Sequence, residues 1–139
     1  MFHGKIIVDF KTTIEGRALV MDVPISFLGD IDPETGTIRA SDSAKKGRSI
    51  KDKILVLRGS RGSTVGSYVL YALRENGVAP RAIIAEKPEP IIIVGCIISD
   101  IPLVDLRNDD FFNNIKDEDI VTITPTGVIR IEKRSTNSA

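Results

Sequence analysis

The sequence predicts a single β-rich domain of the α/β or α+β class. Short runs of β-branched and apolar residues recur along the chain, one helical pattern stands near the middle, and no repeat or linker divides the 139 residues. A chain of this length hides roughly 68% of the surface that it exposes when unfolded, which is enough for one core. We expect the domain to cover residues 1–134 and the polar tail 135–139 to be disordered.

Strand signals dominate the first half of the chain. The runs "GKIIVDF" (residues 4–10) and "GRALVMDVPISF" (residues 16–27) are apolar or β-branched and are bounded by glycine and proline. A turn follows, because Pro33 presets its own φ and Gly36 accepts a positive φ. The basic stretch of residues 41–53 predicts a surface loop with a turn at Gly47 and with solvated charges.

The pattern then changes to that of an amphipathic helix. Apolar residues recur at spacings of three and four, as expected for one buried face: Val65, Tyr68, Val69, Ala72 and Leu73. Asn76 and Gly77 predict the end of this helix, because both residues tolerate the left-handed conformation of a C-cap.

Strands return in the second half. A short strand is predicted within residues 80–86, and a buried segment within residues 87–106, with a helix from Pro90 and a strand at 101–104. The ending predicts a hairpin, since the alternating runs 120–123 and 128–131 enclose the turn sequence "TPTG".

Composition excludes several classes of protein. Lys plus Arg and Asp plus Glu number 19 each, so the broad cationic field of a nucleic-acid binder is absent. The longest apolar run, residues 91–98, is shorter than the ~20 residues that cross a bilayer, and we expect a cytoplasmic protein without membrane contact. His3 and Cys96 are the sole residues of their types, so a metal site made by this chain alone would lack ligands. Cys96 is predicted to be a small buried apolar residue.

A buried strand is predicted to begin at Lys53, and the stretch between it and the helix is rich in glycine and hydroxyl side chains. It reads "RGSRGSTVGS" over residues 58–67, with glycines that let the backbone approach a ligand. The first N–H groups of the helix lack internal partners, so this loop is a candidate anion site. The alternative is that Ser63 or Thr64 only caps the helix. The loop is neither a Walker A motif nor a G-x-S-x-G elbow.

Three segments resemble one known family. They are "SFLGDIDPETGTI" (26–38), "GRSIKDKILVLRGSRGSTVGSYVL" (47–70) and "GVAPRAIIAEKPEPIIIVGCIISDIPLVD" (77–105). In this order they are similar to the small subunit of the aconitase X family, whose archaeal two-subunit members are phosphomevalonate dehydratases. The resemblance implies a swivelling β/β/α domain, as in the aconitase C-terminal domain.

The resemblance also implies an activity and a partner. The small subunit forms a heterodimer with a large catalytic subunit that holds a 4Fe–4S cluster, and the pair is a hydro-lyase of isoprenoid biosynthesis. It dehydrates (R)-5-phosphomevalonate, a phosphorylated hydroxy acid of the mevalonate pathway, to trans-anhydromevalonate 5-phosphate, with the cluster as Lewis acid. The serine after Arg-Gly in the family's loop corresponds to Ser63, the implied catalytic base. The substrate-binding residues expected beside it are Ser60, Arg61, Gly62, Thr64 and Ser67.

Two positions depart from the family and two alternatives remain. Leu28 stands where tryptophan is usual, and residues 41–49 lack the family's histidine.

The alternatives are a subunit of a hydroxyproline-type dehydratase and a non-catalytic domain that binds an anion. Phe27 is a candidate anchor for the partner subunit.

Overall fold

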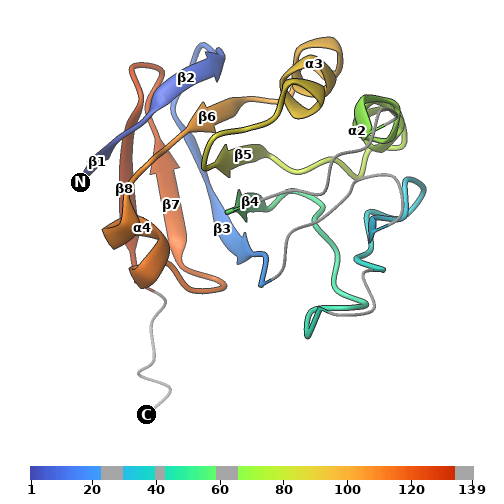
Figure 1. The fold of residues 1–139 in the computed structure, drawn as a ribbon, viewed down its shortest axis with the longest axis horizontal. Coiled ribbons are helices and arrows are strands. Elements are labelled where there is room, and N and C mark those ends of the chain that lie inside the picture. The colour runs from blue at the N-terminus through green and yellow to red at the C-terminus, as the bar shows by residue number, and fades with distance from the viewer. Residues whose placement is uncertain (23–29, 40–42, 59–65, 134–139) are drawn as a thin grey trace.

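A computed structural model describes residues 1–22, 30–39, 43–58 and 66–133 of the chain (Figure 1). Within these ranges, eight strands form one sheet in the order β1-β8-β7-β3-β4-β5-β6-β2. The strands are β1 (Phe2–His3), β2 (Lys5–Val8), β3 (Ile14–Val20), β4 (Ile54–Leu57), β5 (Ala82–Ala85), β6 (Leu103–Asp105), β7 (Ile120–Ile123) and β8 (Val128–Glu132). The helices are α2 (Gly66–Glu75), α3 (Pro90–Ser99) and α4 (Asp109–Asn114). The predicted β-rich α/β class is confirmed.

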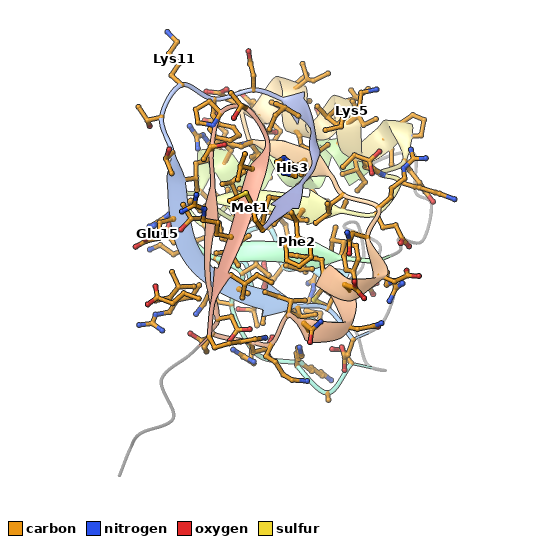
Figure 2. All side chains as sticks on the ribbon, turned by 90° about the vertical axis from the view of Figure 1, so that its left-hand side faces the viewer. Met1, Phe2, His3, Lys5, Lys11 and Glu15 are labelled. Carbon is orange, nitrogen blue, oxygen red and sulfur yellow. The ribbon has the colours of Figure 1, made fainter. Side chains whose placement is uncertain are left out.

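The sheet curls until its two edges meet. Strands β3 to β6 pair in parallel, whereas β7, β8 and the two edge strands pair antiparallel to their neighbours. The edge strands β1 and β2 are consecutive in sequence and are separated by Gly4 alone. Gly4 donates its N–H to the carbonyl of Gly127 at 2.8 Å, and a Cβ atom at Gly4 would collide with the side chain of Val104. Glycine at this position therefore lets the sheet close into a barrel-like shape, which Figure 2 shows from the side of Phe2 and His3.

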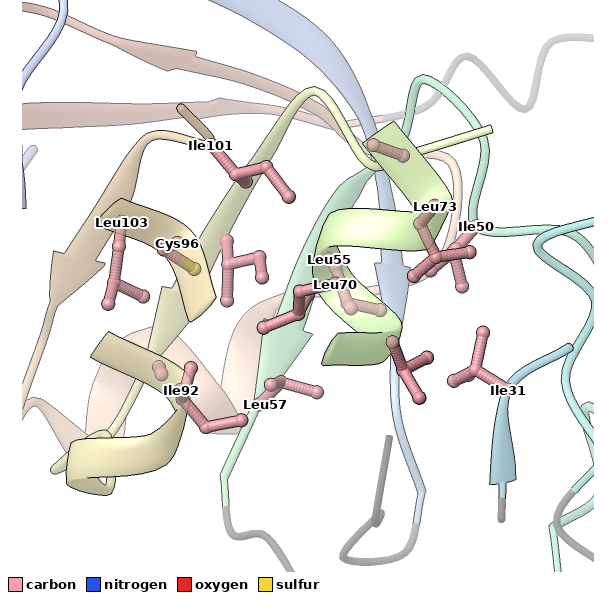
Figure 3. Packing of buried hydrophobic residues seen from close by; sticks show 14 of the residues in the cluster. Ile31, Ile50, Leu55, Leu57, Leu70, Leu73, Ile92, Cys96, Ile101 and Leu103 are labelled. Carbon is pink, nitrogen blue, oxygen red and sulfur yellow. The ribbon is translucent and has the colours of Figure 1, made fainter. Parts of the chain in front are cut away.

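Both faces of the central strands are buried, which explains their nearly continuous apolar sequences. In β4, Leu55 and Leu57 belong to the core under the helices α2 and α3, and Figure 3 shows them facing these helices. Ile54 and Val56 point to the opposite face and join the second core, which β7, β8 and α4 enclose. The period of two along the strand thus assigns alternate residues to two separate cores.

The helix α2 is confirmed, with one correction to its buried face. Val69, Leu70 and Leu73 pack on the sheet, and Gly77 ends the segment with a φ of +72°. Tyr68, predicted to lie on the buried stripe, is 77% exposed. The prediction was wrong at this residue because Val69, Leu70 and Leu73 define the buried face, and Tyr68, two residues before Leu70, lies roughly 160° around the helix from it.

The remaining helices differ from the sequence prediction in opposite ways. α3 begins at Pro90 as predicted, but the segment is buried on one side only, since Ile97 and Ile98 are 59% and 54% exposed. α4 was missed by the sequence analysis. Its signal is Asn108, whose side chain accepts a hydrogen bond from the N–H of Phe111 and so caps the helix.

The basic stretch between β3 and β4 is more than a solvated loop. Lys45 and Arg48 lie 2.9 Å and 2.7 Å from the carboxylate oxygens of Asp117, and Lys53 lies 2.9 Å from Glu118. The expectation that its charges face solvent was therefore wrong for these three side chains, because the turn before β7 supplies acidic partners, whereas Lys46 and Lys51 are exposed as expected. A turn at Gly47, with a φ of +93°, is confirmed.

These ion pairs control the titration of Asp117. Burial by itself raises the pKa of this carboxyl group, but the N–H of Val20 and the side chains of Lys45 and Arg48 outweigh burial and lower the pKa. The carboxylate thus ties the end of β3 to the basic stretch.

The hairpin of β7 and β8 is confirmed, with Gly127 at a φ of +95° in its turn. Within the described part of the chain, no helix has the length and apolar character needed to cross a membrane. The predicted disordered tail, residues 135–139, lies outside the described residues, and the single domain over residues 1–134 stays a prediction.

Candidate functional site

The carboxyl ends of the parallel strands β3 to β6 meet at one edge of the sheet. In parallel α/β sheets this edge is where ligands bind, because loops and helix N-termini gather there. Arg58 follows β4, Glu86 and Lys87 follow β5, and Arg107 follows β6 closely. The glycine and hydroxyl loop joins the same end of β4 to the first residue of α2, Gly66.

Five of the six predicted site residues lie in this loop, outside the described residues: Ser60, Arg61, Gly62, Ser63 and Thr64. The described residues on either side are Arg58, directly after β4, and Gly66, the first residue of α2. The roles of the five residues stay predictions.

Ser67, the sixth predicted site residue, lies in the first turn of α2 and is half-buried. Its backbone packs against Gly95 of α3, where a Cβ atom would lie only 3.0 Å from the Cα of Ser67. Gly95 thus allows the N-terminal turn of α2 to approach α3 closely, and this contact positions the helix end that follows the loop.

Arg58 anchors the start of the loop and was not among the predicted site residues. Its guanidinium lies 2.5 Å from Asp109 and 3.6 Å from Glu86, and it stacks 5.2 Å from the ring centre of Phe112. These contacts turn the side chain toward α4 and hold the carboxyl end of β4. The sequence signal was its position directly before the first glycine of the loop.

A small pocket opens at the same edge, with a volume of about 170 Å³. Its lining comes from the ends of β4 and β5 and from the N-terminus of α3: Leu57, Ala85, Glu86, Lys87, Pro88, Glu89 and Ile92. Lys87 has a φ of +50°, which is uncommon for a residue with a side chain. The buried carboxylate of Asp105 holds this conformation by accepting the N–H of Lys87 at 3.1 Å. Arg107 pairs with the same carboxylate at 3.0 Å, and this contact raises the pKa of Arg107.

A second pocket, of about 390 Å³, lies at the opposite edge, beside the amino ends of β4 and β5. Two of its cations are already engaged with protein groups. Arg81 donates to the carbonyl of Glu15 at 2.7 Å, and Lys53 pairs with Glu118. This pocket is larger, but the carboxyl edge lies beside the glycine-rich segment that the sequence analysis identified and beside the N-terminus of α2, and it is the better candidate.

The described residues do not fit an iron–sulfur cluster. Cys96 lies on the inner side of α3 and is fully buried, as predicted, and burial raises its pKa to about 12, which disfavours the thiolate form that binds metals. No group of three or more His, Cys, Asp or Glu residues in the described ranges could hold a metal ion. A cluster needs thiolates from several positions, and this chain has one cysteine.

Comparison with known proteins assigns this architecture to a family. The model of the aconitase X swivel domain matches residues 1–131. The chain belongs to the aconitase X swivel domain family. The predicted swivelling fold and the resemblance to aconitase X are thereby confirmed, and the family is one of iron–sulfur enzymes.

The curated relatives most similar in the comparison include several phosphomevalonate dehydratase small subunits. The phosphomevalonate dehydratase small subunit of Pyrococcus abyssi is 60% identical over 94 residues, covering 68% of this chain and 72% of the relative. That of Methanosarcina mazei is 46% identical over 126 residues, covering 90% of this chain and 88% of the relative. The name "small subunit" implies a larger partner subunit.

Solved structures agree with the swivel domain along nearly the whole chain. The holo-form of aconitase X from Thermococcus kodakaraensis superposes with a TM-score of 0.86 at 42% identity, over 95% of this chain and 98% of that chain. A UPF0107 protein solved by solution NMR gives a TM-score of 0.84 at 46% identity, over 96% of this chain and 98% of that chain.

Proposed function

We propose that this chain is the small subunit of a phosphomevalonate dehydratase and that it is active only together with its large subunit. The observation that carries the proposal is the agreement of the curated relatives, which bear this name at 44% to 60% identity in several archaea. The same agreement disfavours the hydroxyproline-type dehydratase and the non-catalytic anion-binding domain.

The proposed reaction removes water from (R)-5-phosphomevalonate and gives trans-anhydromevalonate 5-phosphate. Ser63 takes the proton from the carbon next to the carboxylate, and the hydroxyl group leaves from the neighbouring carbon as the double bond forms. The iron–sulfur cluster belongs, in this proposal, to the large subunit, in keeping with the poor fit of a cluster to this chain. The complex works in the cytoplasm.

The place of Ser63 suits a base but does not suffice for one. It lies three residues before α2, a helix of ten residues without an acidic side chain in its first turn. A helix N-terminus stabilises a negative charge by about 0.3–1 kcal/mol and at most ~2 kcal/mol. Since one pKa unit corresponds to about 1.36 kcal/mol, the helix lowers a hydroxyl pKa by roughly one unit. Ser63 therefore needs further help, and the isolated chain should be inactive.

The further help comes from the loop and from closure of the site. Arg61 supplies a positive charge, and Ser60, Gly62, Thr64 and Ser67 supply N–H and hydroxyl donors for the carboxylate or phosphate of the substrate. A large subunit that covers the loop excludes water, which strengthens each of these interactions. Arg58 and Gly95 have a structural role instead, since Arg58 holds the end of β4 and Gly95 lets the first turn of α2 pack on α3.

The test is the turnover of phosphomevalonate by the complex of both subunits, prepared without oxygen. Ser63→Ala should reduce turnover by about 10²- to 10⁴-fold, the usual contribution of a general base, with assembly intact. The control is Ser49→Ala, at an exposed serine of the stretch between β3 and β4, which should leave turnover unchanged. Normal turnover by the Ser63 variant would show that another group is the base.

A further inference from the structure

The outer face of α2 and α3 carries an apolar patch. Five large apolar side chains are exposed there, and we call them the outer helical patch: Tyr68, Tyr71, Val94, Ile97 and Ile98. Apart from Met1, they are all the exposed large apolar side chains of the described residues. The two helices pack directly on one another and lie together on one side of the sheet (Figure 1).

The sequence of α3 is that of a helix covered on every side. Its ten residues contain no charged side chain. Ile92 and Cys96 face the core, whereas Val94, Ile97 and Ile98 face outward and are 48%, 59% and 54% exposed. A surface helix normally turns polar residues outward, and a helix that is apolar all round is normally buried all round. The outer side of α3 thus lacks a cover that its composition requires.

The patch also has the shape and the border of an interface. A hollow of about 250 Å³ lies between the helices and is lined by Tyr68, Tyr71 and Ile98. Exposed charged residues stand at the carboxyl ends of both helices, namely Arg74 and Glu75 on α2 and Asp100 after α3. An apolar centre that includes tyrosines, with polar and charged residues at the rim, is typical of a protein interface.

We infer that the large subunit docks on the outer helical patch. This inference rests on the proposed function, in which the large subunit must reach Ser63. The patch adjoins that place, because Tyr68 lies in the first turn of α2, five residues after Ser63, and is 77% exposed. A partner that covers the loop therefore meets Tyr68 next and continues over Ile98. Phe27, the anchor expected from the sequence, lies outside the described residues.

The experiment measures the dissociation constant of the small and large subunits of the same organism. Ile98→Glu should weaken binding by about 30- to 100-fold, as expected for a charge placed in the centre of an interface. Ile97→Ser should weaken it less. The control is Thr126→Glu, which adds the same single charge at the exposed turn between β7 and β8. Circular dichroism and melting temperatures of the isolated variants should match those of the original chain.

The outcomes separate this inference from the proposed function. If the original chain binds the large subunit and Ile98→Glu binds equally well, the docking site is wrong and the proposed function stands. If the original chain does not bind the large subunit at all, both are wrong. If Ile98→Glu only converts a dimer of this chain into a monomer and binding of the large subunit persists, the patch serves a second copy and the inference is overturned.

Discussion

The two cores of the domain are covered to different degrees. On the side of β7, β8 and α4 the chain encloses its own apolar residues, and Phe111 is fully buried at its centre. On the side of α2 and α3 the inner residues are equally well buried, but five large apolar side chains remain exposed on the outside. Exposed apolar surface is unfavourable on either side of the sheet, and a large patch of it is typical of a binding surface. The outer side of α2 and α3 is therefore the side where we expect another molecule to bind. The candidate site lies at the end of this second region.

The largest expected effect is at the enclosed core. Phe111→Ala should lower the free energy of unfolding by about 3–5 kcal/mol, because the ring is fully buried and packs edge-on against Phe2 and Phe112 at 5.3 Å and 5.2 Å. Urea unfolding of the isolated chain measures this loss. Phe111→Leu, which keeps most of the volume, should cost less. A loss below about 1 kcal/mol for the alanine variant would mean that this side is loosely packed.

A smaller effect is expected where the two helices meet. Gly95→Ala should destabilise the chain by about 1–3 kcal/mol, because the new methyl group collides with Leu70 and with the backbone of Ser67. At an uncrowded helix position the same change stabilises by about 0.8–1.0 kcal/mol. The sign of the measured change therefore shows whether Gly95 is crowded by α2. Thermal or urea unfolding provides the measurement. A more stable variant would contradict the close approach of α2 and α3.

The smallest effect concerns the charges at the rim of the enclosed side. Asp117→Asn should lower stability by roughly 1 kcal/mol at neutral pH, since the carboxylate is paired and partly buried. Folding lowers the pKa of Asp117 from its ordinary 3.8, so its contribution is present above that value and is lost as the pH falls through the folded pKa. Urea unfolding of both proteins from neutral pH down to about 2.5 should therefore converge in acid. Parallel curves over the whole range would mean that Asp117 contributes nothing through its charge.

Local patterns were enough to predict much of the fold. Three short-range signals were confirmed by the structure. They are the alternating apolar residues of β7 and β8 around Gly127, Gly77 at the end of α2, and Pro90 at the start of α3. The position of the glycine loop between β4 and α2 was also predictable, because a strand pattern stops and a helix pattern starts there. The family resemblance added the roles proposed for Ser63 and its neighbours.

The sequence by itself determined the elements, their order and the loop that carries the candidate site, because hydrophobic period and turn residues act over a few positions. Only the tertiary structure decided that Tyr68 faces outward, since a helix turns toward whichever neighbours bury most surface. It alone brought Arg48 to Asp117, 69 residues apart in sequence. Long-range pairing and the burial of a given face depend on the whole chain at once, and no short window of residues contains them.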